Sequence, residues 1–226
     1  MPTMILLRHG QSMWNAMNVF TGWVDVALSE KGINEALRAG ELIANTPIDM
    51  IFTSTLMRAQ QTAMIAMAKH SSGRVPIMIH DQDPKEKEWT KIYNENTEAK
   101  CIPTYANWHL NERYYGELQG KDKQETRDQY GDEQVKIWRR SYDIPPPKGE
   151  SLKLTAERTL PYLNNTIIPV LEQNKTILVS AHGNSLRSII MQIEKLNEEQ
   201  VLELEVATGD PLFYDYKDGT FIKTNG

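Results

Sequence analysis

The sequence predicts an α/β fold in which helices flank an open, mostly parallel sheet. Short apolar runs alternate with longer segments of helical period, an alternation typical of parallel strands joined by helical crossovers. The run KTILVSA at 175–181 is β-branched and apolar, as expected of a central strand covered on both faces. With 226 residues the chain is long enough for one such domain with a sizeable core, although two small domains would also fit this length.

The first elements of the chain follow this alternation. Residues 4–8 predict a short buried strand that ends at charged residues. Ser29 then opens a helical pattern, and Pro47 lies just beyond its end. The apolar positions on roughly one face of this helix are Ile33, Ala36, Leu37 and Ile43.

Two more strands are expected in the middle of the chain, at DMIFTS (49–54) and VPIMIH (75–80). Residues 55–69 between them predict a helix, and its methionines at core spacing are interpreted as packing residues. Residues 81–103 are polar and lack a clear period, which predicts a loop or an irregular insertion.

The second half of the chain supplies the remaining elements. Short helices are expected around 121–130 and 132–141, and the prolines at 145–147 end that region. The elements that follow are a long helix from about 151 to 172, the strand at 175–181, helices from Ser185 and near 197–205, and short strands near 211–216 and 220–223.

Composition excludes several classes of protein. A net charge of −5 argues against nucleic acid as the main partner, and also against a polybasic surface that would bind membranes. The single cysteine, Cys101, cannot form an internal disulfide, which indicates a reducing compartment. The N-terminal apolar run is too short for a signal peptide and no stretch approaches a membrane span, so we expect a cytoplasmic protein.

Charged and titratable residues follow the apolar runs at several strand ends. Arg8 and His9 precede a glycine after the first strand, and His182 precedes a glycine after the strand at 175–181. Arg58 comes roughly one turn into the helix after the second strand, and Glu112 lies in the polar segment LNERYYG. Ligands of open α/β sheets gather outside the carboxyl ends of the strands, so we expect these side chains to converge there.

Such a set of residues can transfer a phosphoryl group. Neutral His9 would be the nucleophile, with its second ring N–H held by an acceptor such as a backbone carbonyl. Arg8 and Arg58 offer planar forks for phosphate oxygens, and His182, if protonated, adds a further positive donor. Glu112 is the carboxylate placed to exchange a proton with a substrate hydroxyl. An arginine-rich pocket of this kind needs no metal.

Each of these residues also has a purely structural interpretation when taken alone. A lone strand-end histidine is more often a hydrogen-bonded structural residue, and Glu112 alone would be an ordinary loop carboxylate. The two histidine–glycine strand ends together with Arg58 favour function. We interpret His70, His80 and His109 as structural because they lack that pattern. The sequence does not predict a metal site, because it has no histidine pair at i, i+4 and Cys101 has no partner cysteine.

Several motifs resemble the cofactor-dependent phosphoglycerate mutases of the histidine phosphatase superfamily. The resemblance runs from the N-terminus to about residue 217. RHG alone marks only the superfamily, whereas LNERYYG with LQGKDK, followed by RRSYD and PPP, is specific to the mutases. The matching segments are LLRHGQSMWN, FTGW (20–23), LNERYYGELQGKDKQET (110–126), RRSYDIPPP (139–147), ESL (150–152) and AHGNSLR (181–187).

The resemblance implies a role for each matched residue. His9 would be the phosphorylated nucleophile, Glu112 the proton donor and acceptor, and His182 a stabiliser of the transferring group. The phosphate pocket would be lined by Arg8, Asn15, Arg58, Gly183 and Asn184. Thr21 and Gly22 would contact the phosphoglycerate, and its carboxylate and second phosphate would be held by Arg113, Tyr115, Lys123, Arg139 and Arg140.

The resemblance also implies the fold and the reaction. It implies a phosphoglycerate mutase-like domain over residues 1–226 that interconverts 3-phosphoglycerate and 2-phosphoglycerate in glycolysis and gluconeogenesis. The primer would be 2,3-bisphosphoglycerate, with no metal, and the partners small-molecule phosphoglycerates. A phosphatase of the same superfamily and a catalytically inactive scaffold are the alternatives, and the complete set of cationic and acid–base residues argues against the scaffold.

Three departures from the family pattern carry expectations of their own. Residues 81–103 are extra; following the third strand, they should emerge beside His9 and could form a mobile lid. The chain is short between PPPK and ESL, which leaves a monomer or a dimer open. It also ends at Gly226 without the lysine-rich tail of many members, which bears on closure of the site.

Overall fold

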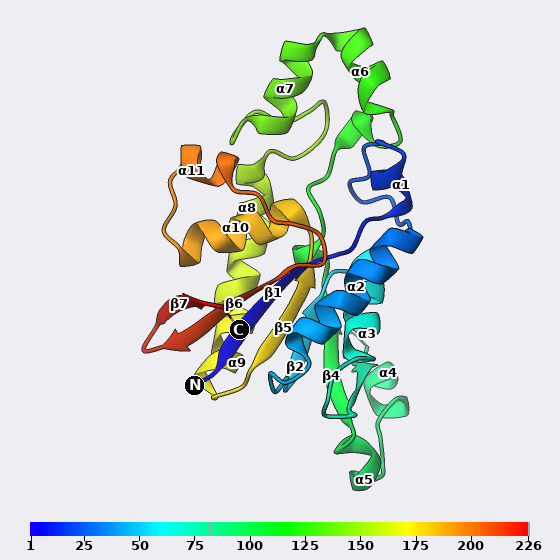
Figure 1. The fold of residues 1–226 in the computed structure, drawn as a ribbon, viewed down its shortest axis with the longest axis vertical. Helices are drawn as coiled ribbons and strands as arrows, with labels where there is room; N and C mark the ends of the chain where they lie inside the picture. Colours follow the sequence, from blue (N-terminus) through cyan, green and yellow to red (C-terminus); the bar gives the residue numbers. More distant parts are fainter. Residues whose placement is uncertain (82, 226) are drawn as a thin grey trace.

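The strands form one mostly parallel sheet at the centre of the molecule (Figure 1). The computed structural model describes residues 1–81 and 83–225, and within them the sheet has seven strands in the order β3-β4-β2-β5-β1-β6-β7. The strands are β1 Thr3–Arg8, β2 Met50–Thr53, β3 Val75–Met78, β4 Cys101–Ala106, β5 Ile177–Ala181, β6 Pro211–Lys217 and β7 Thr220–Thr224. The predicted fold class is confirmed.

The pairing directions place the carboxyl ends of five strands along the same side of the sheet. β3, β4, β2, β5 and β1 are all parallel to their neighbours, whereas β6 is antiparallel to β1 and to β7. β5 is central and completely buried, as its apolar sequence predicts. Because the parallel strands share a direction, the segments that leave β1, β2 and β5 meet at the same edge.

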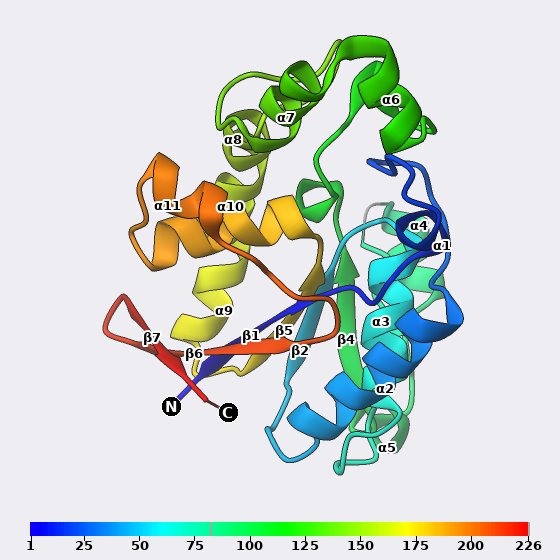
Figure 2. The same ribbon diagram turned by 45° about the horizontal axis from the view of Figure 1, so that its top comes forward.

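Helices cover both faces of the sheet (Figure 2). On one face, α2 and α3 pack against alternate strand residues such as Ile5 and Leu7; on the other, α8, α9 and α10 pack against Met4 and Leu6. The helices are α1 Met13–Ala16, α2 Glu30–Ile43, α3 Met57–Met67, α4 Pro84–Trp89, α5 Glu95–Glu98, α6 Lys123–Tyr130, α7 Asp132–Arg140, α8 Leu152–Tyr162, α9 Ile168–Glu172, α10 Gly183–Ile193 and α11 Glu198–Glu203, with short 3₁₀ turns η1 Trp108–Leu110 and η2 Gly116–Leu118.

The helix predicted after Ser29 is present, but its buried face differs in part from the expectation. The Ser29 hydroxyl caps α2 by accepting a hydrogen bond from Gly32 N–H at 3.2 Å. Ile33 is 42% exposed, whereas Ala36, Ala39, Gly40 and Ile43 are buried. Small residues form this face because α2 lies close to α3: a Cβ at Gly40 would collide with a main-chain oxygen of α3.

The long helix predicted over 151–172 is continuous but changes its winding in the middle. α8 passes into a π-helical segment, η3 Leu163–Ile167, and then into α9. Pro169 has no N–H to donate to the carbonyl four residues earlier, and its ring crowds that carbonyl. A wider local winding immediately before Pro169 relieves this conflict, which accounts for the π segment.

The prediction that residues 81–103 form a loop or irregular insertion is wrong in part. The segment contains α4 and α5, and β4 begins at Cys101 and lies between β3 and β2. Pro103 concealed this strand in the sequence, because proline cannot donate to a neighbouring strand and rarely occurs inside a sheet. In both views α5 lies at the end of the molecule opposite α6 and α7.

Candidate active site

The two histidines predicted at strand ends lie side by side. Arg8 of β1 is in register with Ala181 of β5, and the His9 N–H continues the pairing by donating to the Ala181 carbonyl at 3.0 Å. The next residues along the two strands, His9 and His182, therefore face each other, with ring centroids 4.9 Å apart. Adjacent parallel strands thus bring together residues separated by most of the sequence.

His9 is held in the form that a nucleophile requires. Its Nδ1–H donates to the Gly10 carbonyl oxygen at 2.6 Å, which leaves Nε2 as the unprotonated nitrogen of a neutral ring. Burial lowers the pKa of His9 well below its usual value, and the charges of Arg58 and Arg8 lower it further. His9 is therefore neutral near pH 7 and presents a free Nε2.

Gly10 has a steric role in this arrangement. A Cβ at Gly10 would collide with the Gly32 carbonyl, and one at Gly32 would collide with the main chain of Gln11. The N-terminal turn of α2 consequently packs directly on the backbone that follows His9. The Gly10 N–H donates to Thr62 Oγ1 of α3 at 3.1 Å, so both helices fix the position of this turn.

His182 would be a positive donor only if protonated, and its surroundings disfavour the protonated form. It is completely buried, and its Nε2 lies 2.7 Å from the Ser54 hydroxyl at the end of β2. Burial lowers the pKa of His182 well below its usual value, and Arg58 and His9 add to the effect. In the site as it stands His182 is therefore neutral, because the arginines gathered for an anion also disfavour a second cation.

Glu112 lies between η1 and η2 and points toward the N-terminus of α10. Its Oε1 accepts hydrogen bonds from Arg113 N–H at 2.7 Å and from the Asn184 side-chain amide at 2.8 Å. Burial alone would raise the pKa of Glu112, but these hydrogen bonds and the charges of Arg8 and Arg58 outweigh it and lower the pKa. Glu112 is therefore ionised and ready to accept a proton.

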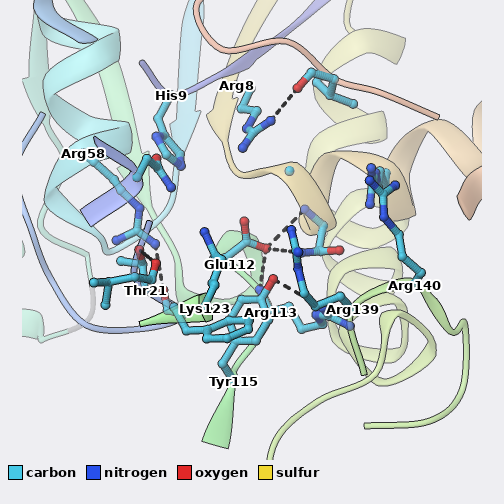
Figure 3. A pocket seen from close by; sticks show the side chains of 18 residues that line it. Arg8, His9, Thr21, Arg58, Glu112, Arg113, Tyr115, Lys123, Arg139 and Arg140 are labelled. Atoms are coloured by element: carbon cyan, nitrogen blue, oxygen red, sulfur yellow. Dashed lines mark hydrogen bonds between the residues drawn. The ribbon is translucent and has the colours of Figure 1, made fainter. Parts of the chain in front are cut away.

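The histidine and the glutamate open onto a cavity lined by cations (Figure 3). Among the described residues that line it, Glu112 is accompanied by seven cationic side chains: Arg8, Arg58, Arg113, Lys123, Arg139, Arg140 and Arg187. The predicted residues Asn15, Thr21, Gly22, Tyr115, Gly183 and Asn184 line it too. His182 is the predicted site residue outside the lining, and it is completely buried.

The seven cations come from six parts of the fold: β1, α3, the segment between η1 and η2, α6, α7 and α10. Arg58 lies in the first turn of α3, closer to its start than expected, and donates to the carbonyls of Gly22 at 2.7 Å and Val24 at 3.0 Å. Burial lowers the pKa of Arg58 to about 10, so it remains charged. Lys123 begins α6, and Arg139 and Arg140 end α7. Helices α6 and α7 thus complete the side of the cavity away from the sheet.

The structure does not support a lid formed by residues 81–103. Of the residues that it describes in this range, none lines the cavity. The parallel crossover from β3 must return to the opposite edge of the sheet before β4 can begin, so α5 is carried away from His9. The nearby covering elements are instead α6 and α7.

Sequence reasoning did not assign roles to Arg187, Val206 or Ser54. Arg187 follows Gly183 by four residues and therefore lies on the same face of α10, a spacing that could have identified it. Its Nε donates to the Leu204 carbonyl at 2.8 Å. Val206 and Ser54 reach the site through the tertiary fold, and no local motif marks them.

Two observations bear on the predicted cofactors and partners. Within residues 1–81 and 83–225, no group of three or more His, Cys, Asp or Glu side chains is arranged to hold a metal ion. Over the same residues, no helix is both long and apolar enough to cross a membrane.

Comparison with known proteins gives the family. Residues 4–108 and 88–224 match the histidine phosphatase superfamily (branch 1). The chain is 56% identical over 223 residues to the 2,3-bisphosphoglycerate-dependent phosphoglycerate mutase of Protochlamydia amoebophila (strain UWE25), covering 99% of each. It is 58% identical over 221 residues to that of Chlamydia felis (strain Fe/C-56), covering 98% of this chain and 96% of the relative.

A solved structure shows the same fold at much lower sequence identity. Bacillus stearothermophilus YhfR matches 99% of this chain and 95% of its own with a TM-score of 0.76 at 22% identity. The relatives above, matched over nearly their full length, define the family more narrowly than the fold does. The chain therefore belongs to the 2,3-bisphosphoglycerate-dependent phosphoglycerate mutases of the histidine phosphatase superfamily.

Proposed function

We propose that this protein interconverts 3-phosphoglycerate and 2-phosphoglycerate through a phosphoryl group carried on Nε2 of His9, after priming by 2,3-bisphosphoglycerate. The observation that carries the proposal is the distribution of charge in the cavity. In Figure 3, His9 and Arg58 lie on one side, Arg139 and Arg140 on the other, and Glu112 between them. A ligand with two anionic ends and a hydroxyl between them matches this arrangement.

The proposed chemistry moves one phosphoryl group and one proton in each direction. In the forward step a hydroxyl of the bound monophosphoglycerate attacks phosphorus, an O–P bond forms and the N–P bond to His9 Nε2 breaks. Glu112, which its lowered pKa keeps ionised before the step, takes the hydroxyl proton. When the bisphosphorylated product is bound the other way round, His9 attacks its second phosphate, and Glu112 returns the proton to the departing oxygen.

The cations stabilise the charge that moves between nitrogen and oxygen. Arg8 and Arg58 are the forks nearest to His9, and the Nε atoms of Arg8 and Arg113 are buried without a hydrogen-bond partner among the described residues. Buried donors left unpaired in this way fit an anionic ligand that satisfies them on binding. 2,3-Bisphosphoglycerate, when bound, supplies the phosphoryl group that primes His9.

Positive charge for phosphoryl transfer comes from side chains of this chain, so we propose a metal-independent reaction. The substrates are small phosphorylated acids, which the seven cations select in a chain whose overall charge is −5. The reducing environment indicated by the lone Cys101 leads us to propose the cytoplasm as its location.

The test is to follow conversion of 3-phosphoglycerate to 2-phosphoglycerate with and without added 2,3-bisphosphoglycerate. Protein first stripped of phosphate should convert substrate only after the bisphosphate is added. Radiolabelled bisphosphate should also leave an acid-labile label on wild-type protein and none on His9→Ala. Release of inorganic phosphate faster than isomerisation would instead assign the protein as a phosphatase.

A further inference from the structure

A buried arginine outside the cavity gathers the main chain that carries Glu112. Arg158 of α8 has a side chain only 8% exposed. Its guanidinium donates to four main-chain carbonyl oxygens within residues 108–112. These are the carbonyls of Trp108 at 3.3 Å, His109 at 2.8 Å, Asn111 at 3.0 Å and Glu112 at 2.9 Å. One side chain therefore fixes the backbone on the N-terminal side of Glu112 and the carbonyl of Glu112 itself.

Glu150 completes this arrangement from the other side. It receives a two-point hydrogen bond from Arg158, with Nε to Oε1 at 2.8 Å and Nη2 to Oε2 at 3.0 Å. Its Oε2 also accepts from the Tyr114 N–H at 2.9 Å, and its own N–H donates to the Tyr114 carbonyl at 2.7 Å. The Arg158–Glu150 pair thus holds the chain on both sides of Glu112.

Trp23 links the main chain at Glu112 to the segment predicted to contact substrate. Its Nε1–H donates to the Glu112 carbonyl at 2.6 Å, and the Arg158 guanidinium lies over its ring at 5.4 Å from the centroid. Trp23 directly follows Thr21 and Gly22, both of which line the cavity. The Glu112 carbonyl therefore receives two donors, one from α8 and one from the 21–23 segment.

Glu112 needs such support because its segment has little regular structure of its own. Residues 108–118 contain only the short turns η1 and η2 within the described chain, so neither a long helix nor a strand holds the acid–base residue. A general base must stand within hydrogen-bond reach of the reacting hydroxyl, and small displacements cost large factors in rate. Buried ion pairs contribute little net stability on average, so stability alone is a weak reason for this pair.

We propose that Arg158, together with Glu150, is a positioning residue that sets the Glu112 carboxylate relative to His9 Nε2 during proton transfer. The inference rests on the proposed mutase function, since it concerns the step in which Glu112 exchanges a proton with substrate. Among the described residues, Arg158 donates hydrogen bonds to main-chain carbonyls and to Glu150 and lies over the Trp23 ring, and it does not line the cavity. It therefore acts through Glu112 and not by touching the ligand.

The first experiment replaces Arg158 with lysine, which keeps the charge but cannot reproduce the fork. We expect kcat for the mutase reaction to fall roughly ten- to hundredfold, with KM for 3-phosphoglycerate within about twofold of wild type. Arg74→Lys is the matched control, because Arg74 also holds two carbonyls, Ile48 at 3.2 Å and Cys101 at 2.6 Å, away from the cavity. It should leave kcat unchanged.

Trp23→Phe provides a second variant that keeps a six-membered aromatic ring and removes the five-membered ring of the indole, with its Nε1–H donor to the Glu112 carbonyl. It should lower kcat in the same direction by a smaller factor, about three- to tenfold, again with little change in KM. This variant keeps the inference testable if Arg158→Lys folds poorly, which thermal unfolding of each variant would reveal.

The decisive measurement combines these changes with Glu112→Gln in single-turnover assays with enzyme in excess. If Arg158 acts through Glu112, adding Arg158→Lys or Trp23→Phe to Glu112→Gln leaves its residual rate unchanged within about twofold. The same proportional loss in both backgrounds, or a rise in KM with unchanged kcat, overturns the inference. A wild-type rate in Glu112→Gln alone would instead refute the proposed role of Glu112, independently of Arg158.

Discussion

Replacing Glu112 with glutamine tests the proposed proton transfer with little change of shape. Glutamine can still accept at Oε1 from Arg113 N–H and from the Asn184 amide, the contacts that Glu112 makes at 2.7 and 2.8 Å. The variant should therefore fold and keep its cavity. It loses the ability to accept a proton, and it removes the carboxylate that faces seven cationic side chains.

The expected loss can be set from the role of the residue. General acid–base groups contribute about 10²- to 10⁴-fold, so kcat should fall by this factor, equivalent to about 3–5 kcal/mol in the barrier. Binding should change in the opposite sense, because a cavity without its carboxylate attracts anions more strongly. KM for 3-phosphoglycerate should consequently stay constant or fall.

The assay is the enolase-coupled conversion of 3-phosphoglycerate at saturating 2,3-bisphosphoglycerate, supported by direct titration of the bisphosphate. An aryl phosphate provides the internal control, because its leaving group needs no proton and any turnover of it should be far less affected. A kcat within about threefold of wild type would refute Glu112 as the acid–base group. A fall in kcat accompanied by much weaker binding would mean that Glu112 shapes the cavity instead.

The other predictions concern the nucleophile, metal, pH and packing. His9→Ala should abolish both isomerisation and any phosphatase activity in product assays, because both require the phosphoenzyme; substantial turnover would contradict this. Activity should survive dialysis against excess EDTA, and loss restored by Mn²⁺ would show that a metal takes part. Because burial lowers the pKa values of His9 and His182 in the folded state, the unfolded chain binds more protons below about pH 6.5. The free energy of unfolding, measured in urea, should therefore fall as pH decreases from about 6.5, and less steeply in His182→Gln. Gly32→Ala should lower stability by about 1–3 kcal/mol in the same assay, since its Cβ would meet main chain of Gln11.

The parts of the fold that follow local patterns could be predicted from sequence. The apolar runs gave most strands, Ser29 marked the start of α2, and the histidine–glycine pairs located two strand ends that the sheet brings together. β4 could not be predicted, because Pro103 is a local signal against a strand. The strand forms nevertheless, because it pairs with β2 on one side and β3 on the other. The formation of β4 thus depends on pairing with strands that are distant in the sequence, and a local stretch of sequence carries no information on that pairing.

The candidate site shows the same division. Arg8, His9 and Glu112 lie within recognisable motifs, whereas the neutral state of His182 depends on burial and on arginines from other elements. The support of Glu112 by Arg158 joins residues 46 positions apart, and nothing near Arg158 in the sequence indicates it. Motifs thus identify the reacting groups, and the tertiary structure sets their charge and position.

The cations around the cavity also make the resistance of this protein to proteolysis depend on the concentration of its ligands. Seven cations with one carboxylate among them leave an excess of positive charge that opposes the folded state, and a phosphorylated ligand that pairs with them binds only that state. A ligand present at a hundred times its dissociation constant adds about 2.7 kcal/mol to the free energy of unfolding. The population of unfolded chain, which is the form that proteases cleave, would then be about a hundredfold smaller. The half-life of the enzyme should therefore lengthen when phosphoglycerates are abundant and shorten when they are depleted, so that protein turnover follows demand for the reaction.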